Sequence, residues 1–179
     1  MIPLLETKRL RLREWRDSDI EPFAGINRDP AVMRFFPGAL DRAQTIDYIE
    51  KAKEHFRRHG VGKWAVELRE NGTLIGCVGI DTVDFDAPWR NVPEIAWRLS
   101  SRHWGQGYAP EAATAVIDFM FEEEDCPEIV AFTAVHNSQS RRVMEKIGMQ
   151  YEAGADFDHP KLPVEHPLCR HVLYRIRKA

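Results

Sequence analysis

The stretch from Glu94 to Glu111 constrains the fold of this chain more than any other part of the sequence. Apolar and polar residues alternate from Glu94 to Ser100, which predicts a strand with its larger apolar residues on one face. A turn that contains Gly105 and Gly107 follows, and Pro110 is typical of the first turn of a helix. The sequence therefore predicts a strand that passes through a tight turn directly into a helix.

This junction has features of an anion site. The first N–H groups of a helix lack partners within the helix and carry about half a positive charge, so they attract phosphate. Glycines permit a positive φ and a close approach of phosphate to the backbone. The dinucleotide fingerprint does not match, because Pro110 stands where a further glycine is required, and the Walker pattern lacks its Gly-Lys-Ser/Thr end. An anion site and a purely connecting turn therefore both remain open.

The other patterns predict one α+β domain over residues 1–179, with a mixed central sheet and helices on its faces. Asn71-Gly72 is a hairpin signal, and Asp41 with Gln44 resembles a capping box at the start of a helix that ends at Gly60. Further helices are expected at residues 20–26, after the glycine turn, and from Asn137 or Ser138 to Gly148. Strands are expected at residues 9–13, 64–69, 73–83, 94–100, 129–135, 149–153 and 171–176, the last two joined by a proline-rich loop.

Composition and charge exclude several functions. The chain has 25 Lys and Arg against 28 Asp and Glu, a net charge of −3, which argues against a dedicated nucleic-acid binder. No apolar run approaches the ~20 residues that span a bilayer, and residues 1–9 show no signal-peptide pattern. The three cysteines are scattered, which is typical of reduced thiols. We therefore expect a cytoplasmic protein with neither a membrane nor a nucleic acid as partner.

Several motifs resemble those of one known family. Arg102–Gly107 fits the Q/R-x-x-G-x-G/A pyrophosphate motif of the GNAT superfamily of acetyltransferases. Asn137–Met149 resembles the N-x-x-S-x-x-(V/L)-x-x-K-(L/I)-G-(F/M) segment of the branch that contains the ribosomal-protein N-terminal acetyltransferases, and Glu6–Arg13 resembles the opening strand of that branch. The resemblance covers about residues 6–155. It implies a GNAT-like domain whose sheet splays into a V, flanked by about four helices. The implied activity is N-acetyltransfer from acetyl-CoA to a primary amine, by direct attack in a ternary complex.

The resemblance also implies where acetyl-CoA, the co-substrate, would bind. The backbone N–H groups of residues 105–109 would hold the pyrophosphate, and the strand around Leu99 would pair with the pantetheine arm. Asn137 would contact pantetheine or cap its helix, and Ser140 would lie near the thioester sulfur or be only a polar residue of the first turn. The implied cofactor-binding residues are Leu99, Arg102, Gly105, Gln106, Gly107, Tyr108, Ala109, Asn137 and Ser140.

Amine acetylation requires proton transfer, and three catalytic candidates follow from the sequence. Glu94 opens the motif strand and is the first candidate base, unless it is only an exposed carboxylate at the strand edge. His136 is the second candidate base, and water is a third. The tyrosine that many family members use as the acid is absent from residues 141–148, so Ser140 or solvent has to protonate the thiolate.

The proline-rich tail loop is expected to lie over the acceptor pocket, where the family places acceptor contacts. Its acidic residues predict a negative field that attracts a cationic acceptor, unless the loop is only a solvated acidic segment. The histidines and carboxylates of the tail match no metal-site spacing, so we expect no metal. The four acidic residues are Glu152, Asp156, Asp158 and Glu165.

Three further residues are candidates for the site. Trp89, in a loop with prolines, is expected near the pocket. Arg141 and Arg142 follow the start of the second motif helix, where they either meet the 3′-phosphate of CoA or form a solvent-exposed face.

The enzyme is the leading interpretation of the whole chain, and two others compete with it. One is a non-catalytic acyl-CoA sensor that keeps the glycine turn without the chemistry. The other is a structural domain in which the turn binds nothing. The acceptor, a small-molecule amine or a protein N-terminus, is not readable from the sequence, and the same holds for the oligomeric state, monomer or homodimer.

Overall fold

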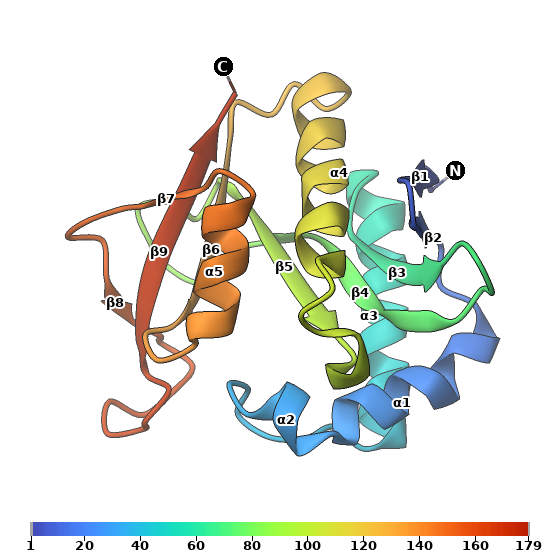
Figure 1. The fold of residues 1–179 in the computed structure, drawn as a ribbon. Helices are drawn as coiled ribbons and strands as arrows, with labels where there is room; N and C mark the ends of the chain where they lie inside the picture. The colour runs from blue at the N-terminus through green and yellow to red at the C-terminus, as the bar shows by residue number, and fades with distance from the viewer. Residues whose placement is uncertain (1, 179) are drawn as a thin grey trace.

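A single mixed sheet organises the computed structural model of this protein, which describes residues 2–178 (Figure 1). The order across the sheet is β1-β2-β3-β4-β5-β6-β9-β7, with β8 paired to β9. Adjacent strands are antiparallel except for β5 and β6, which are parallel. The strands are β1 (Leu5–Glu6), β2 (Leu10–Arg13), β3 (Lys63–Leu68), β4 (Leu74–Thr82), β5 (Pro93–Leu99), β6 (Glu128–Ala134), β7 (Gln150–Tyr151), β8 (Phe157–Asp158) and β9 (Arg170–Arg177).

Helices cover both faces of this sheet. On one face α4 and α5 pack on a core that includes Ile95 and Leu99 of β5. On the other face α1, α2 and α3 pack on a second core that includes Cys77 of β4. The helices are α1 (Ile20–Arg28), α2 (Pro30–Met33), α3 (Arg42–His59), α4 (Tyr108–Glu122) and α5 (Ser138–Lys146), with 3₁₀ turns η1 (Asp17–Asp19) and η2 (Ser101–His103). This arrangement confirms the α+β class expected from the sequence.

The sheet opens between β5 and β6. Within the described residues the two strands pair at one position, Glu94 with Val130, and they diverge beyond it. β6 instead pairs along its whole length with β9, from Glu128 with Arg177 to Ala134 with His171. The splayed V expected from the family resemblance is therefore confirmed, and its two arms end at η2 and at the start of α5.

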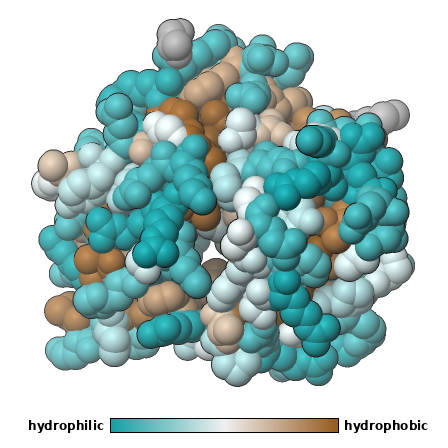
Figure 2. All heavy atoms as spheres, in the orientation of Figure 1, coloured by the Kyte–Doolittle hydropathy of each residue, from teal (hydrophilic) through white to brown (hydrophobic). Residues whose placement is uncertain are grey.

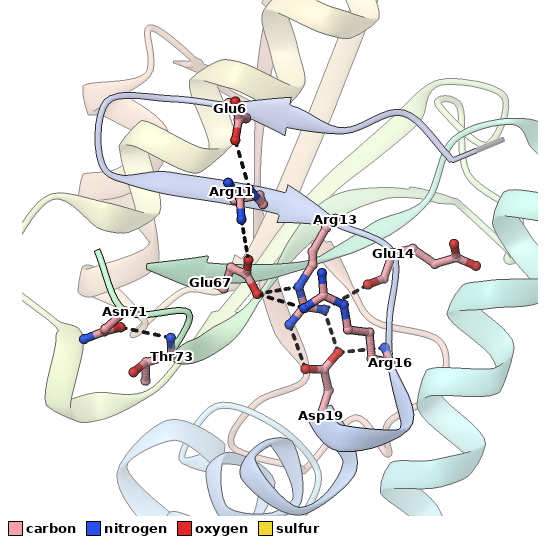
Figure 3. A network of polar contacts seen from close by, with 9 residues as sticks. All are labelled: Glu6, Arg11, Arg13, Glu14, Arg16, Asp19, Glu67, Asn71 and Thr73. Atoms are coloured by element: carbon pink, nitrogen blue, oxygen red, sulfur yellow. Dashed lines mark hydrogen bonds and ion pairs between the residues drawn. The ribbon is translucent and has the colours of Figure 1, made fainter. Parts of the chain in front are cut away.

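A buried ionic network fixes the junction between β2, β3 and η1 (Figure 3). Arg13 is only 6% exposed. Its Nη1 and Nη2 donate to the Asp19 carboxylate at 2.7 and 2.8 Å, and its Nε donates to Glu67 of β3. Burial alone would lower the pKa of Arg13, but the hydrogen bonds from its guanidinium to both carboxylates raise the pKa instead. The charge of this arginine is therefore neutralised entirely by the chain.

Local sequence signals specify most of these elements. The Asp41–Gln44 capping box and the Asn137 cap are confirmed, and Gly60 ends α3 with a φ of 76°. The sequence analysis missed β1, β8 and α2, because two to four residues are too short to show a hydrophobic period. The strand expected at residues 149–153 is reduced to the two residues of β7.

Candidate active site

A cavity of about 580 Å³ occupies the opening between β5 and β6. Figure 2 shows the surface hollowed between the half of the molecule that carries α5 and the half that carries α4. Residues 94–99 of β5 all line this cavity. Since successive residues of a strand point to opposite faces, the cavity reaches both faces of the sheet. One side meets the glycine turn and α5, and the other meets α2 and the tail loop.

The glycine turn forms one end of the cavity. Gly105 and Gly107 have φ values of 73° and 80°, in the left-handed region that favours glycine. Among the described residues, no protein group accepts the backbone N–H of residues 105–109. These five groups precede or begin α4, a helix of 15 residues whose dipole favours an anion at this end. The residues present therefore fit a pyrophosphate.

Arg9 and Glu111 hold this turn in place. Arg9 donates from Nη1 to the carbonyl of Gln106 at 2.8 Å and from Nε to the Glu111 carboxylate at 2.7 Å. Thr7 also donates to Glu111, at 2.6 Å. Burial alone would raise the pKa of Glu111, but the hydrogen bonds from Thr7 and Arg9 outweigh it and lower the pKa. Sequence reasoning missed this anchor, because its partners lie about a hundred positions apart.

The structure brings together some of the implied cofactor residues and separates others. Leu99, Gly105, Gly107, Tyr108 and Ala109 line the cavity. Arg102 and Gln106 do not line it, and both are exposed to solvent. Any contact of these two residues with a bound cofactor therefore has to be made at the rim or through the backbone.

The start of α5 forms another part of the cavity wall. Asn137 lines the cavity and also caps α5, since its Oδ1 accepts the N–H of Ser140 at 3.2 Å. Ser140 and Arg142 line the cavity as well. Arg141 does not: its Nε donates to the Tyr174 hydroxyl at 3.2 Å, so this arginine joins α5 to β9. The two arginines that the sequence could not distinguish thus have separate places.

Glu94 lies on the face of β5 that is turned away from α4. It is partly buried and lines the cavity, so the alternative of an exposed strand-edge carboxylate does not describe it. Burial raises the pKa of Glu94 to about 8; nearby Lys63 opposes the shift, and Asp81 adds to it. A carboxylate with such a pKa can accept a proton near neutral pH.

His136 is not brought together with Glu94. It lines a smaller recess of about 260 Å³ rather than the main cavity, together with Ala31 of α2 and with residues that include Trp104 and Gln139. The reason is local: the backbone N–H of Asn137 and Ser138 bond back to Ala134 and His136, which turns the chain between β6 and α5.

The four acidic tail residues, which the sequence analysis expected to attract a cationic acceptor, do not line the cavity, so the structure gives that expectation no direct contact. Glu152 pairs with Arg175 at 2.7 Å, Asp158 with Arg170 at 3.3 Å, and Asp156 accepts the Tyr151 hydroxyl at 2.8 Å. Arginines on β9 hold two of these carboxylates away from the cavity.

Trp89, which the sequence analysis expected near the pocket, lies behind the cavity wall. It is buried beside Phe157, with ring centroids 5.0 Å apart, in a separate aromatic cluster, and it does not line the cavity. Its aromatic side chain packs under the tail loop, where β8 pairs with β9.

In place of the carboxylates, the polar tail residues that line the cavity are His159, Lys161 and His171, and Leu162 and Leu168 of the same segment line it as well. Lys161 forms an ion pair with Asp84, which ties the tail loop to the loop after β4. Burial lowers the pKa of His159 and of His171, and both imidazoles are therefore neutral at pH 7. The neutral His171 ring donates from Nδ1 to the Cys169 carbonyl at 3.0 Å, which leaves its Nε2 as an acceptor.

The described residues provide neither a cluster of metal ligands nor a membrane-spanning helix. Residues 2–178 contain no group of three or more His, Cys, Asp or Glu side chains placed to hold a metal ion. In the same part of the chain, every helix falls short of the length and apolar character needed to cross a bilayer.

Known proteins match this chain over most of its length. The family model described as acetyltransferase (GNAT) domain matches residues 9–150. The uncharacterised protein YkkB of Bacillus subtilis is 36% identical over 82% of this chain and 85% of its own. The FsC-acetyl coenzyme A-N(2)-transacetylase of Aspergillus fumigatus is 38% identical over 83% of this chain and 66% of its own.

Solved structures share the fold. An acetyltransferase from Agrobacterium tumefaciens superposes with a TM-score of 0.79 at 29% identity and covers 99% of this chain and 96% of its own. Two further structures show the fold alone, at 17% identity each. The ribosomal-protein-S5-alanine acetyltransferase of Vibrio fischeri has a TM-score of 0.75 and covers 98% of this chain and 96% of its own. The spermidine N-acetyltransferase of Vibrio cholerae has a TM-score of 0.74 and covers 96% of each chain.

These matches agree with three features of the structure: the opening between β5 and β6, the unpartnered amides of the glycine turn and the capped start of α5. They also set aside the sensor and the purely structural domain as interpretations of the whole chain. The chain belongs to the GNAT family of acetyl-CoA-dependent N-acetyltransferases.

Proposed function

We propose that the chain transfers an acetyl group from acetyl-CoA to a primary amine by direct attack within a ternary complex. One observation carries this proposal: a single cavity runs from the glycine turn, through the gap between β5 and β6, to Glu94. Donor and acceptor can therefore enter from opposite faces of the sheet and meet in the gap. Such an arrangement requires no covalent acetyl-enzyme.

The donor would be held by the backbone and by cations of α5. The amides of residues 105–109 fit the pyrophosphate, and Arg142 and Lys146 supply positive charge along the same part of the cavity. Asn137 would contact the pantetheine arm. When bound, acetyl-CoA supplies an activated acyl group whose leaving thiolate is stable.

Glu94 acts as the general base in this proposal. An alkylamine has a pKa of about 10.4 and arrives protonated. A carboxylate whose pKa is raised to about 8 takes the proton far more readily than one with an ordinary pKa. Ser140 lies across the cavity, at the start of α5, and would protonate the departing thiolate. His136 is left without a role, because it faces the smaller recess.

The acceptor class is a primary amine of a small molecule or of a protein N-terminus. The names of the relatives include an S5-alanine acetyltransferase, a spermidine acetyltransferase and an FsC N(2)-transacetylase, so family membership alone leaves the acceptor open.

The test is an acceptor screen with two readouts. Purified protein is incubated with acetyl-CoA and a panel of amines, and released CoA thiol and the acetylated amine are followed by a thiol reagent and by mass spectrometry. We expect intersecting lines when initial rates are measured against both substrates, as a ternary complex requires. Parallel lines, or an acetylated protein trapped before the amine is added, would contradict direct attack.

A further inference from the structure

Arg98 lies on the same face of β5 as Glu94 and also lines the cavity. Within residues 2–178 its guanidinium makes one hydrogen bond, from Nη1 to the side-chain oxygen of Asn27 at 2.8 Å. Its Nε is buried without any hydrogen-bond partner. No carboxylate of the described chain forms an ion pair with it. A partly buried cation beside a cavity is thus left without a counter-charge in the described chain.

Neutral groups fix the position of this cation. Its guanidinium carbon lies 4.3 Å from the ring centroid of Phe36 and 5.0 Å from that of Tyr48, within cation–π range. Asn27 is held in turn by Thr45, to which its Nδ2 donates at 3.0 Å. The arginine is therefore oriented before any ligand arrives, and its charge remains available to one.

The other charges of the cavity have different partners or belong to the cofactor end. Arg142 and Lys146 lie on α5, beside the proposed phosphate site. Lys161 is paired with Asp84. Glu94 is the single carboxylate among the residues that line the cavity. On the acceptor side, Arg98 is therefore the cation whose charge nothing in the described chain neutralises.

The spacing of Glu94 and Arg98 suits one molecule with two functional groups. The two residues are four positions apart on one strand face, about 13 Å along the backbone. Ala96, between them, presents only a methyl group to the cavity. An acceptor can therefore lie along the strand, with its amine near Glu94 and a second group at Arg98.

We propose that the acceptor is a small amine that also carries a carboxylate, and that Arg98 binds this carboxylate. The inference rests on the proposed function and names its substrate class. A guanidinium offers a rigid fork of donors that matches a carboxylate in a bidentate pair, which gives the arginine a specific preference for that group. The second group of the acceptor is then an anion, whereas the acidic tail suggested a cationic acceptor.

The experiment compares matched pairs of acceptors that differ by the carboxylate alone. Each ω-amino acid, from β-alanine to 5-aminovalerate, is paired with its primary amide, and kcat/KM is measured for both members. The wild type is expected to prefer the carboxylate. Arg98→Met is expected to reduce this preference by roughly 10- to 100-fold, since a hydrogen-bonded charge pair is lost, and Arg98→Lys is expected to fall between the two. Arg142→Met serves as the matched control: it should raise the KM for acetyl-CoA and keep the acceptor preference.

A second arm measures binding without turnover, so that the inference and the proposed function can fail separately. Calorimetry follows the binding of N-acetyl-β-alanine and its longer homologues to the protein saturated with CoA. Binding that depends on Arg98, in a protein that acetylates none of the amines, would support the carboxylate site and contradict the proposed function. Turnover of neutral amines with equal rates for both members of every pair, or equal preference in Arg98→Met, would overturn the inference and leave the proposed function intact.

Discussion

Arg13 and Arg98 occupy the same row of the sheet, yet the chain treats them differently. The register runs from Arg13 through Ala65 and Cys77 to Arg98, so both arginines lie on the face covered by α1 and α3. Arg13 meets two buried carboxylates, whereas Arg98 meets an amide and aromatic rings. The first site is complete within the protein. At the second site the charge of Arg98 has no ion-pair partner in the described chain, and the residue lines a cavity.

The physical cost of burial explains why this difference is informative. A buried charge is expensive unless it is paired and hydrogen-bonded. Asp19 and Glu67 meet this requirement for Arg13. For Arg98 the chain supplies orientation without neutralisation, an arrangement suited to a site whose counter-charge comes from a ligand.

The same substitution at both ends of the row tests the comparison most strongly. Arg13→Met leaves Asp19, which is 3% exposed, without its ion-pair partner, and removes the most buried of the three arginines that pair with Glu67. We expect it to lower the free energy of unfolding by about 3–5 kcal/mol. Arg98→Met leaves only the oxygen of Asn27 without its donor, and we expect a loss of about 1 kcal/mol.

Urea unfolding of both variants and the wild type at pH 7 provides the measurement. Equal losses at the two positions would show that Arg98 is as much a part of the folded core as Arg13, and the contrast would then have no meaning for function.

Glu94 extends the comparison of the two arginines to an acidic residue. It lies on the same face of β5 as Arg98, and among the described residues it forms no hydrogen bond with an arginine. We expect Glu94→Gln to reduce kcat/KM by roughly 100-fold or more, as loss of a general base does. In the wild type, kcat/KM should rise with pH through about 8, where Glu94 loses its proton and becomes able to act as the base. The variant should lack this limb.

Asp158→Asn is the matched control for this prediction. It removes a carboxylate of the tail that pairs with Arg170 outside the cavity, so the pH profile should stay that of the wild type. A Glu94→Gln profile that keeps the limb near pH 8 would assign that limb to another group.

A Ser140 variant distinguishes an effect on the leaving thiolate from an effect on acceptor binding. We expect Ser140→Ala to lower kcat by roughly tenfold with every acceptor alike, with little change in the affinity for acetyl-CoA, because a general acid acts on the leaving group whatever the amine is. Arg98→Met, in contrast, should change the ranking of acceptors. Ser138→Ala, one residue into α5 but absent from the main cavity wall, is the control. Equal kcat in Ser140→Ala and the wild type would leave solvent as the acid.

The conformation of the glycine turn and of the start of α5 was largely predictable from the sequence, because its determinants are local. Gly105 and Gly107 lie within one turn, and Asn137 caps the helix that begins at the next residue. Backbone conformation and capping depend on such short stretches, and the family resemblance adds their roles.

The surroundings of Arg98 were not predictable, because they are assembled by packing between elements that lie far apart in the sequence. Arg98 is joined to Asn27 across 71 positions, and the partners of Arg13 lie 6 and 54 positions away. Nothing near either arginine in the sequence says which one is neutralised. The acidic tail misled for the same reason: arginines of β9, up to 23 positions further along the chain, turn its carboxylates outward.

Arg9 and Glu111 provide a half-exposed version of the Arg13 network, and the smallest effect is expected there. Their side chains are 40% and 19% exposed. Solvent screens such a pair, so Glu111→Gln should cost only about 0.5–1 kcal/mol of unfolding free energy at pH 7. The pKa of Glu111 is lowered in the folded state, so its contribution is present above the unfolded pKa and disappears as the pH falls through the folded one.

The unfolding free energies of the wild type and Glu111→Gln should therefore converge in acid, and added salt should narrow their difference at pH 7. Because Arg9 also holds the carbonyl of Gln106, the KM for acetyl-CoA should rise a few-fold. Arg69→Gln is the control. Arg69 donates to the backbone carbonyl of Thr7, in the turn between β1 and β2 that also contains Arg9, and it forms no hydrogen bond with the glycine turn. If the free energy of unfolding instead falls as much in Glu111→Gln as in Arg13→Met, burial does not determine how much each arginine pair contributes to stability. The contrast between Arg13 and Arg98 would then need another cause.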